Sequence, residues 1–301
     1  MTSTHPVFPT RCRAPRCTTS TFAIEPSFEP EKPTPHAVVV ESPGAETREP
    51  ISEPARLARC RILATWGDFL EAEAGILHVA SVNPQADGSL RGLAIGAGAP
   101  GSEIDRFSLS VARARVDAIV TTGRILRREP DLCHDLPEDL RAWRREVLGK
   151  ESSPVVVVLS RSGALPLDHP VFDRQNVVVV VPPSAEAETR AKFIGRRTEI
   201  VAIEDLTPRS LIESLRWRGL DSLCIEAGPS TSMDLYRSPG LVDELMLSIF
   251  EQRILPEDQI VGALPPPDFL RSHFGLQVAE YSQMQGEGLW RFRRYRRETR
   301  G

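Results

Sequence analysis

One segment of the chain combines an acidic residue with a run of small residues where a strand is expected to pass into a helix. Leu223–Ile225 is apolar, as a buried strand would be, and Ser230 begins a segment with the composition of a helix. Between them lie Glu226 and a small-residue turn that contains Gly228. Free backbone N–H groups at such a turn, together with the helix dipole, favour an anion, and a glycine lets the anion approach closely. The arrangement is typical of a phosphate-binding turn.

An ordinary strand-to-helix turn that binds nothing is the alternative interpretation of this segment. The dinucleotide-binding fingerprint G-x-G-x-x-G is absent, and a single glycine turn does not specify a ligand site. The choice between the two interpretations therefore depends on the rest of the chain.

The elements that would position this turn alternate between strands and helices. Apolar runs and turn residues predict strands over Gly75–Val82, Asp117–Thr122, Pro154–Ser160, Asn176–Val181, Thr198–Ile203, Ser222–Glu226, Glu244–Phe250, Leu276–Ser282 and Leu289–Arg296. Helical periodicity and caps predict helices over Ala55–Ala74, Ser102–Arg115, Leu136–Leu148, Ser184–Gly195, Thr207–Arg218 and Ser230–Arg237. The helix over residues 136–148 is highly charged, so we expect it to be an exposed excursion.

Two of these strands, over residues 154–160 and 176–181, are apolar throughout. Strands of this kind are buried on both faces, as in a parallel sheet that is covered by helices. The last three strands follow one another with little helix between them. The sequence therefore predicts an α/β fold, with a mostly parallel sheet flanked by helices and antiparallel strands added late.

Residues 1–54 differ in composition from the rest of the chain. They hold ten of the 26 prolines and many serines, threonines and glutamates, so we expect this segment to be disordered and residues 55–301 to form a single domain. The first 24 residues contain arginines but no acidic residue, as organellar transit peptides do, although their prolines oppose the amphipathic helix of such peptides. We expect a cytoplasmic protein, with organellar targeting as the alternative.

The composition argues against several classes of function. A formal net charge of −4 gives no overall basic field for nucleic acid or an anionic membrane. No run approaches the roughly 18 apolar residues of a membrane span. Arginines do cluster over residues 291–300, but alternate basic residues on a strand usually form one solvated face. The five cysteines indicate reduced thiols; a metal shared by Cys12 and Cys17 is the alternative, and we expect no metal.

The residues that follow the turn make the phosphate interpretation more specific. Glu226–Ser230 reads E-A-G-P-S, and Gly240–Leu245 reads G-L-V-D-E-L. In this order and at this separation, the two motifs resemble E-G-G-P-T and G-L-V-D-E-L of the C-terminal reductase domain of bacterial bifunctional riboflavin-biosynthesis deaminase-reductases and its stand-alone relatives. The zinc signature of the deaminase half, H-x-E followed by P-C-x-x-C, does not precede them, so we expect that half to be absent.

Other stretches are similar to the same family in the same order, over residues 75–297. They are Asp87-Gly88, which resembles the D-G after the family's first strand, Ala112–Val120 (L-R-A-x-x-D-A-I-L), Thr121–Pro130 (G-A-G-T-V-R-A-D-D-P), Val157–Gly163 (V-V-S-R-S-G) and Phe292–Arg296, which resembles the aromatic and basic last strand.

The resemblance implies a fold and an activity. The family is similar in fold to dihydrofolate reductase, which implies NADPH as the hydride donor. The implied activity resembles that of 5-amino-6-(5-phosphoribosylamino)uracil reductase: the ribose of a ribosylaminopyrimidine 5′-phosphate is reduced at C1′ to the ribityl form. Because the cofactor carries the hydride, the protein mainly has to align the reactants and exclude water.

The resemblance also assigns roles to individual residues. The cofactor would be held by Ala227, Gly228, Pro229, Ser230, Thr231, Ser160, Thr122 and Gly123. Arg113 and Asp87 would contact the substrate, and the planar fork of an arginine suits a phosphate. Glu226 is the candidate catalytic residue. The alternatives are that Arg113 is a surface arginine and that Glu226 is a structural carboxylate.

Several positions depart from the family pattern. Ala227 replaces a glycine and crowds the phosphate by a methyl group, Arg124 stands where the family has threonine, and Arg128-Glu129 stands where it has two aspartates. Two other functions therefore stay open. One is a reductase of the same fold that acts on another small carbonyl, imine or pteridine; the other is a non-catalytic protein that has kept the fold.

The late strands bear on assembly. Glu244–Phe250 and Leu289–Arg296 are apolar and aromatic, and no later helix is available to cover them. An uncovered apolar face favours association, and the family resemblance also implies a dimer, so we expect a homodimer. The alternative is that the helix expected over Ala55–Ala74 folds back over these strands and leaves a monomer.

Overall fold

The computed structural model describes residues 50–71, 75–94, 100–151, 153–174, 176–237, 241–252, 260–274, 276–285 and 288–297. Residues 1–49 of the segment expected to be disordered, with Cys12 and Cys17, lie outside the described residues. The strands are β1 (Ile76–Pro84), β2 (Leu90–Leu93), β3 (Ala118–Thr122), β4 (Val155–Leu159), β5 (Val177–Val181), β6 (Thr198–Ala202), β7 (Leu223–Ile225), β8 (Glu244–Phe250), β9 (Ile260–Leu264), β10 (Leu276–Gln285) and β11 (Gly288–Arg296). The helices are α1 (Glu53–Trp66), α2 (Glu103–Ala114), α3 (Gly123–Arg128), α4 (Glu138–Glu146), α5 (Val171–Arg174), α6 (Pro183–Lys192), α7 (Pro208–Arg216), α8 (Pro229–Ser232), the 3-10 helix η1 (Met233–Tyr236) and α9 (Pro267–Phe274).

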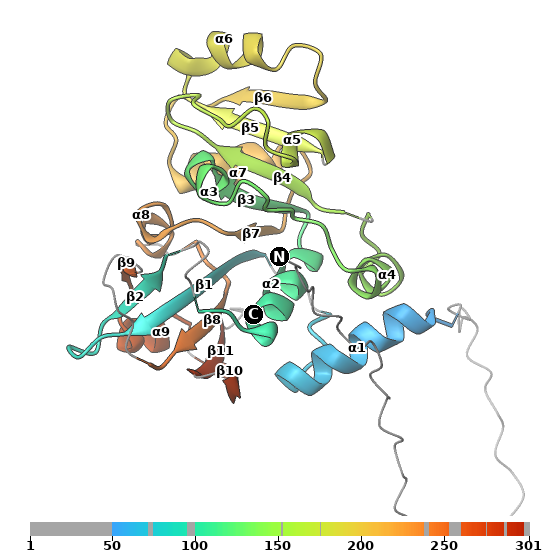
Figure 1. The fold of residues 1–301 in the computed structure, drawn as a ribbon, viewed down its shortest axis with the longest axis vertical. Helices are drawn as coiled ribbons and strands as arrows, with labels where there is room; N and C mark the ends of the chain where they lie inside the picture. The colour runs from blue at the N-terminus through green and yellow to red at the C-terminus, as the bar shows by residue number, and fades with distance from the viewer. Residues whose placement is uncertain are drawn as a thin grey trace, which may run out of the picture. The chain divides into compact units, whose positions relative to one another are not determined.

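These strands form one mixed sheet with the order β10-β11-β8-β1-β7-β3-β4-β5-β6, and β2 and β9 extend it from β1 (Figure 1). Every neighbouring pair from β8 to β6 in this order is parallel. The late strands β10 and β11 are antiparallel, as are the pairs that β2 makes with β1 and β9. The predicted fold class is therefore confirmed, whereas the strands β2 and β9 and the helices α3, α5 and α9 were not predicted.

The side chains of the parallel strands alternate between two buried layers, as the pleat of a strand requires. On one face, Val120, Ile225 and Leu247 belong to a core cluster with residues of α7, η1 and α9. On the other face, Ile119 and Cys224 pack with residues of α1, α2 and α4. Farther along that second face, the valines of β4 and β5 pack with residues of α3, α5 and α6. The all-apolar strands are covered on both sides, which is why they lack alternation.

The first helix is shorter than the sequence suggested. It begins at Glu53, where the Ser52 side chain accepts a hydrogen bond from the Ala55 N–H group at 3.4 Å. It ends at Trp66 rather than at residue 74, because Gly67 adopts a left-handed φ of 65° and its N–H group bonds to the Leu63 carbonyl. A glycine in this conformation is the commonest way to end a helix.

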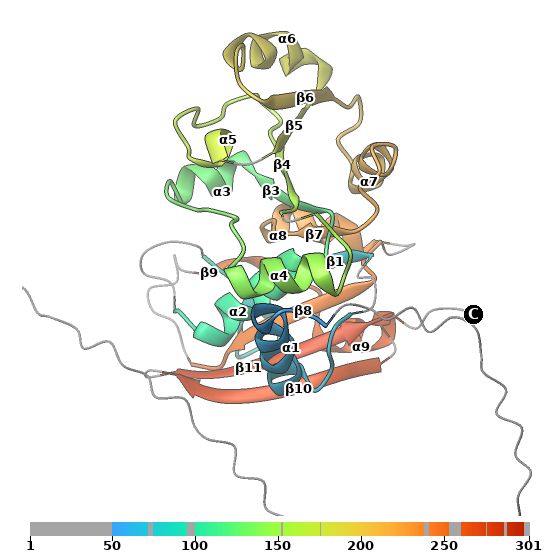
Figure 2. The same cartoon turned by 90° about the vertical axis from the view of Figure 1, so that its right-hand side faces the viewer.

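The charged helix α4 is not the exposed excursion that its composition indicated. Leu140 and Trp143 are fully buried in the cluster that also holds α1. Figure 2 shows α1 and α4 together on one side of the sheet. Glu138, Arg141 and Arg145 are exposed, whereas Arg144 is buried and its guanidinium donates to the carbonyls of Ala114 and Val116.

The dimer was expected because the late strands had no later helix to cover their apolar face. In the structure, α1 of the same chain covers this face. Trp290 and Phe292 of β11 are 1% and 0% exposed, and they share a buried cluster with Ala58, Ile62 and Trp66 of α1. The uncovered face therefore no longer favours association, and the homodimer stays a prediction that rests on the family resemblance. Within the described residues, no helix has both the length and the apolar character needed to cross a membrane.

Candidate active site

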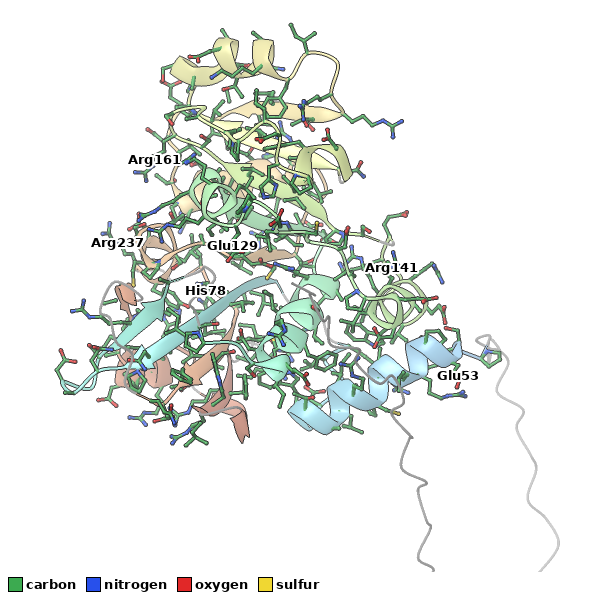
Figure 3. All side chains as sticks on the ribbon, in the orientation of Figure 1. Glu53, His78, Glu129, Arg141, Arg161 and Arg237 are labelled. Carbon is green, nitrogen blue, oxygen red and sulfur yellow. The ribbon has the colours of Figure 1, made fainter. Side chains whose placement is uncertain are left out.

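A cavity of about 1100 Å³ opens at the carboxyl ends of β3, β4 and β7 and extends along β1. Its walls come from segments that are far apart in the sequence. Figure 3 labels three of the lining residues: His78 on β1, Glu129 at the end of α3 and Arg161 just after β4. In open α/β sheets, ligands bind in the crevice at the carboxyl ends of the strands, so this cavity is the candidate active site.

The parallel register explains why the predicted residues meet here. Thr122 ends β3 opposite Leu159, the last residue of β4, and Ile225 ends β7 opposite Val120. The residues that follow these strand ends must therefore emerge at one edge of the sheet. The predicted residues that line the cavity are Thr122, Gly123, Ser160, Glu226, Ala227, Gly228, Pro229, Ser230, Thr231 and Arg113.

Asp87 is the predicted site residue that the structure does not bring to the cavity. It lies in the turn between β1 and β2, and its carboxylate accepts a hydrogen bond from the Ser89 N–H group at 2.9 Å. This local bond holds the turn, which is the usual role of an aspartate in such a position. The D-G pair of the sequence marks a tight turn in this structure and not a wall of the cavity.

The turn at Gly228 has room for a ligand directly above its backbone. Gly228 has an ordinary φ of −62°, and a Cβ added to it would meet no atom within 4 Å. Its carbonyl accepts hydrogen bonds from the N–H groups of Thr231 and Ser232 at 2.9 and 3.1 Å. Since Pro229 has no N–H group, Ala227, Gly228 and Ser230 supply the backbone donors with which the turn could hold an anion.

Gly123 has a different reason for lacking a side chain. A Cβ at this position would lie 2.8 Å from Cδ2 of Leu165, so a larger residue would require the Leu165 side chain to move. The neighbouring Thr122 accepts a hydrogen bond from the Ile125 N–H group at 3.3 Å and caps α3. Both residues line the cavity, but they also have structural roles that the sequence pattern did not reveal.

Arg113 and Glu226 form a bidentate ion pair in the wall of the cavity. Nε of Arg113 donates to Oε1 of Glu226 at 2.7 Å, and Nη2 donates to Oε2 at 2.6 Å. The two side chains are only 7% and 11% exposed. Burial acts to raise the pKa of the Glu226 carboxyl, but the charge of Arg113 outweighs it and holds this pKa below its ordinary value. Glu226 is therefore ionised, and Arg113 is not the free surface arginine of the alternative interpretation.

Two other titratable groups surround this pair. Glu129 lines the cavity, and burial raises the pKa of its carboxyl, with the Glu226 charge adding to the effect and Arg113 opposing it. His134 is fully buried, with Nε2 3.9 Å from Oε2 of Glu226. Burial lowers the pKa of His134 to about 4, so its imidazole is neutral. Neither ring nitrogen of His134 has a hydrogen-bond partner in the described part of the chain.

The wall formed by β1 contributes residues that sequence reasoning missed. His78 lines the cavity, and its Nδ1 lies 2.5 Å from the hydroxyl oxygen of Tyr236 in η1. Asp105, in the first turn of α2, also lines the cavity, and its Oδ1 accepts a hydrogen bond from the Ser81 hydroxyl at 3.1 Å. No local signal marks either residue, because each gains its setting from strands distant in the sequence.

Basic residues gather around the opposite wall. Arg124 and Arg128 on α3 and Arg161 after β4 line the cavity, and among the described residues none of the three forms an ion pair or a side-chain hydrogen bond. Arg124 and Arg128 are two of the departures from the family pattern. Unpaired guanidinium groups beside the Gly228 turn make this wall suited to phosphate groups.

The chain is similar to a known protein family and to several solved structures. Residues 86–251 match the family described as the RibD C-terminal domain. Among solved structures, the chain is similar to a pyrimidine reductase-like protein of Corynebacterium diphtheriae, with 22% identity and a TM-score of 0.55 over 75% of this chain and 93% of that one. This likeness shows a shared fold.

Two other solved structures have lower scores. The RibD protein of Acinetobacter baumannii is 17% identical, with a TM-score of 0.47 over 75% of this chain and 58% of its own. The riboflavin biosynthesis reductase of Saccharomyces cerevisiae is 12% identical, with a TM-score of 0.46 over 74% and 91%. The similarity thus covers little more than half of the Acinetobacter baumannii protein. None of the curated proteins matches the chain.

Proposed function

The chain belongs to the RibD C-terminal domain family, and on that premise we propose that it is an NADPH-dependent reductase of riboflavin biosynthesis. The reaction would reduce the ribose of a ribosylaminopyrimidine 5′-phosphate to the ribityl form. The observation that carries this proposal is the cavity at the carboxyl ends of β3, β4 and β7, which gathers the family-like turn and two strand ends in one place.

The residues present fit a phosphorylated dinucleotide. The space above Gly228 is open, since a Cβ placed there would meet no atom within 4 Å, and Arg124, Arg128 and Arg161 offer positive charge around the same cavity. Ala227 lines the cavity, so its methyl group narrows the approach but leaves the Gly228 side open. NADPH bound here would supply a hydride, and the chain's own residues would orient the reactants and exclude water.

The Arg113–Glu226 pair would fix the geometry of the substrate side. Arg113 uses Nε and Nη2 on Glu226, which leaves Nη1 to donate to a substrate oxygen. Glu226 stays ionised, so in this proposal it accepts a hydrogen bond from a ribose hydroxyl and does not donate a proton. Arg113 would accordingly act as a member of a pair and not as a free phosphate ligand.

The proton that the reduction consumes needs a separate donor. Glu129 meets the requirements, because it lines the cavity and burial raises the pKa of its carboxyl, which keeps a proton on it to higher pH. The ring-opened sugar is an imine at C1′, so reduction would place the hydride on C1′ and the Glu129 proton on the nitrogen bonded to C1′. Solvent would return the proton to Glu129.

A cofactor titration tests the proposal. The purified protein should bind NADPH saturably by fluorescence or calorimetry and consume it when a ribosylaminopyrimidine phosphate is added. The variant Gly228→Val should lose cofactor binding at an unchanged melting temperature, because the added Cβ would point into open space, with no atom within 4 Å of it. Gly219→Val is not a suitable control, since Gly219 has a positive φ of 74°. Ser184→Val, at an exposed position in the first turn of α6, is a suitable control. The absence of binding at millimolar NADPH overturns the proposal.

A further inference from the structure

Gly262 of β9 lines the cavity, but the proposed reaction gives it no role. A Cβ atom added to Gly262 would lie 2.9 Å from Cβ of Pro229 and 3.4 Å from Cγ of the same ring. The proline ring thus occupies the space that a side chain at position 262 would need. Pro229 begins α8, and α8 packs against β9 (Figure 1). The backbone of β9 is therefore in direct contact with the small-residue turn of the candidate cofactor site.

The pairing of β9 with β2 gives Gly262 a special position. Arg91 of β2 lies opposite Ala263, and the next residue, Gly92, lies opposite Val261. Gly262 therefore has no opposite residue on β2 and is the extra residue of a β-bulge. Bulges bend a strand and often occur next to active sites, where they redirect a residue. In this strand, the extra residue is the one that meets the proline ring.

Neither side of this contact can move without cost. Leu264 ends β9 and is buried in a core cluster together with Leu90, its partner on β2. Because β2 pairs in turn with β1, this end of β9 is fixed to the central part of the sheet. On the other side, the ring of Pro229 locks its φ angle and has no free rotation. A side chain at position 262 would therefore displace either the strand or the turn.

The backbone conformation of Gly262 does not by itself require a glycine. Its φ lies outside the left-handed region, unlike that of Gly88 in the turn between β1 and β2, which is 79°. A Cβ added to Gly88 would meet no atom within 4 Å, so space is not what limits that position. The backbone angle therefore explains the glycine at position 88, whereas the contact with Pro229 explains the glycine at position 262.

We propose that Gly262 is a positioning residue for the cofactor. Its missing side chain lets β9 pack on Pro229, and this contact fixes the turn at Gly228, whose backbone N–H groups would bind the phosphates. Such donors are effective only when they are held within about 0.5 Å of the productive position. Because β2 joins β9 to β1, the contact also fixes the turn relative to the cavity wall that β1 forms. The inference rests on the proposed function for the identity of the ligand, NADPH, whereas the contact itself does not depend on it.

The first experiment measures how the turn binds phosphate groups. Inorganic pyrophosphate and NADPH are titrated separately, by calorimetry, into the wild-type protein and into Gly262→Ala. Both dissociation constants should rise by the same factor, about tenfold or more, because a displaced turn loses a hydrogen bond to a charged group. The control Ala263→Ser changes the exposed next residue of β9, which does not line the cavity, and should keep both wild-type values. Unchanged affinities in Gly262→Ala overturn the inference.

The two ligands separate this inference from the proposed function. If the wild-type protein binds pyrophosphate but not NADPH, the proposed function is rejected, and weaker pyrophosphate binding in Gly262→Ala still supports the inference. If the wild-type protein and Gly262→Ala bind NADPH equally well, only the inference fails. If the wild-type protein binds neither ligand, the turn does not hold phosphate groups and both are rejected.

The second experiment removes the other side of the contact. Pro229→Gly lacks the ring atoms that a Cβ at position 262 would meet. Adding Gly262→Ala to Pro229→Gly should therefore change the dissociation constants by less than about twofold, and any loss of melting temperature that Gly262→Ala causes alone should disappear. Equal losses from Gly262→Ala in the two backgrounds, or a double variant that stays unfolded, would show that the residue acts independently of the turn and would overturn the inference.

Discussion

Arg113 and Arg115 lie two residues apart at the end of α2, and each forms an ion pair with a buried glutamate. One pair lies in the wall of the cavity, and the other lies away from it. Residues at this spacing point to different sides of a helix. Arg113 reaches Glu226 in the cavity wall, whereas Arg115 reaches Glu244 at the start of β8, at 2.5 and 3.0 Å. The same pairing chemistry is thus used once at the candidate site and once away from it.

The surroundings of the two pairs differ in how completely the charges are compensated. Glu244 also accepts from Nε of Arg294 at 2.8 Å, and Nη1 of Arg294 donates to Asp68 at 2.8 Å, so two arginines face two carboxylates. Around Glu226 there is one arginine, a second carboxyl on Glu129 and the neutral His134. A closed set of charges holds elements together, while an incompletely compensated set next to a cavity can respond to a ligand or a proton.

The largest effect should come from removing the centre of the closed set. Glu244→Ala leaves Arg115 and Arg294 buried without their main partner, and breaking such a buried pair costs about 3–5 kcal/mol of unfolding free energy. Urea denaturation measures the loss. Glu226→Ala should lose less, because its partner lies beside a cavity that water can enter. Equal losses for the two variants would contradict the distinction between the regions.

A matched pair of arginine substitutions separates stability from activity. Lysine keeps the charge but cannot form the bidentate pair. Arg115→Lys should lower the unfolding free energy by about 1.5–3 kcal/mol and leave kcat/KM for the reductase reaction unchanged. Arg113→Lys should lower kcat/KM by about tenfold or more at a smaller cost in stability, because it displaces Glu226. If both variants change only stability, the pair at the cavity is structural as well.

The two regions should also differ in their response to acid. Burial would raise the pKa of Glu244, but Arg115 and Arg294 lower it from 4.5 to about 2. Because the folded pKa is depressed, this contribution to stability is complete above the unfolded pKa and is lost as the pH falls from about 4.5 toward 2. Between these values the unfolding free energy should fall by about 1.4 kcal/mol per pH unit. Glu244→Gln should flatten this dependence in chemical denaturation, and an unchanged slope would assign it elsewhere.

The smallest effect concerns a polar contact that involves neither Arg113 nor Arg115. Ser52 caps α1, and its N–H group also donates to Oε2 of Glu146 on α4 at 2.7 Å. Ser52→Ala should lower the unfolding free energy by about 1 kcal/mol, as the loss of a helix cap does. A chain that starts at Pro50 should match the full chain in melting temperature and NADPH affinity, whereas one that starts at Ala55 should melt lower. An identical melting temperature for the two truncated chains would show that the Ser52 cap does not contribute to stability.

Local sequence patterns predicted much of the fold and the turn at Gly228. The valine runs of β4 and β5 and the turn at Gly228 are contiguous in the sequence, so their neighbours along the chain define them. The end of α1 could not be placed, because Gly67 and Gly75 both offered a helix stop. The short strand β2 pairs with β1 and β9, and β9 pairs with β2. No pattern within these two segments indicates their partners.

The substrate wall was far less predictable. The sequence identified Arg113 and Glu226 separately, but their pairing joins residues 113 positions apart and changes the role expected of each. The setting of Asp105 depends on two serines, one on β1 and one on β8, that become neighbours only when those strands pair. Asp87 shows the opposite case, since the D-G pair resembled a family feature and the structure uses it as a turn.

The packing of α1 against β11 also has a consequence for how the chain is made. Ile62 and Trp66, near the start of the described chain, share a buried cluster with Trp290 and Phe292, near its end. A ribosome releases these two parts at opposite ends of synthesis, so the part of α1 that packs on β11 stays uncovered until the last strand has emerged, even though α4 is available earlier. Domains with such long-range contacts fold slowly and expose apolar residues in the meantime. The apolar side of α1 is therefore the surface that a chaperone would meet first on the nascent chain.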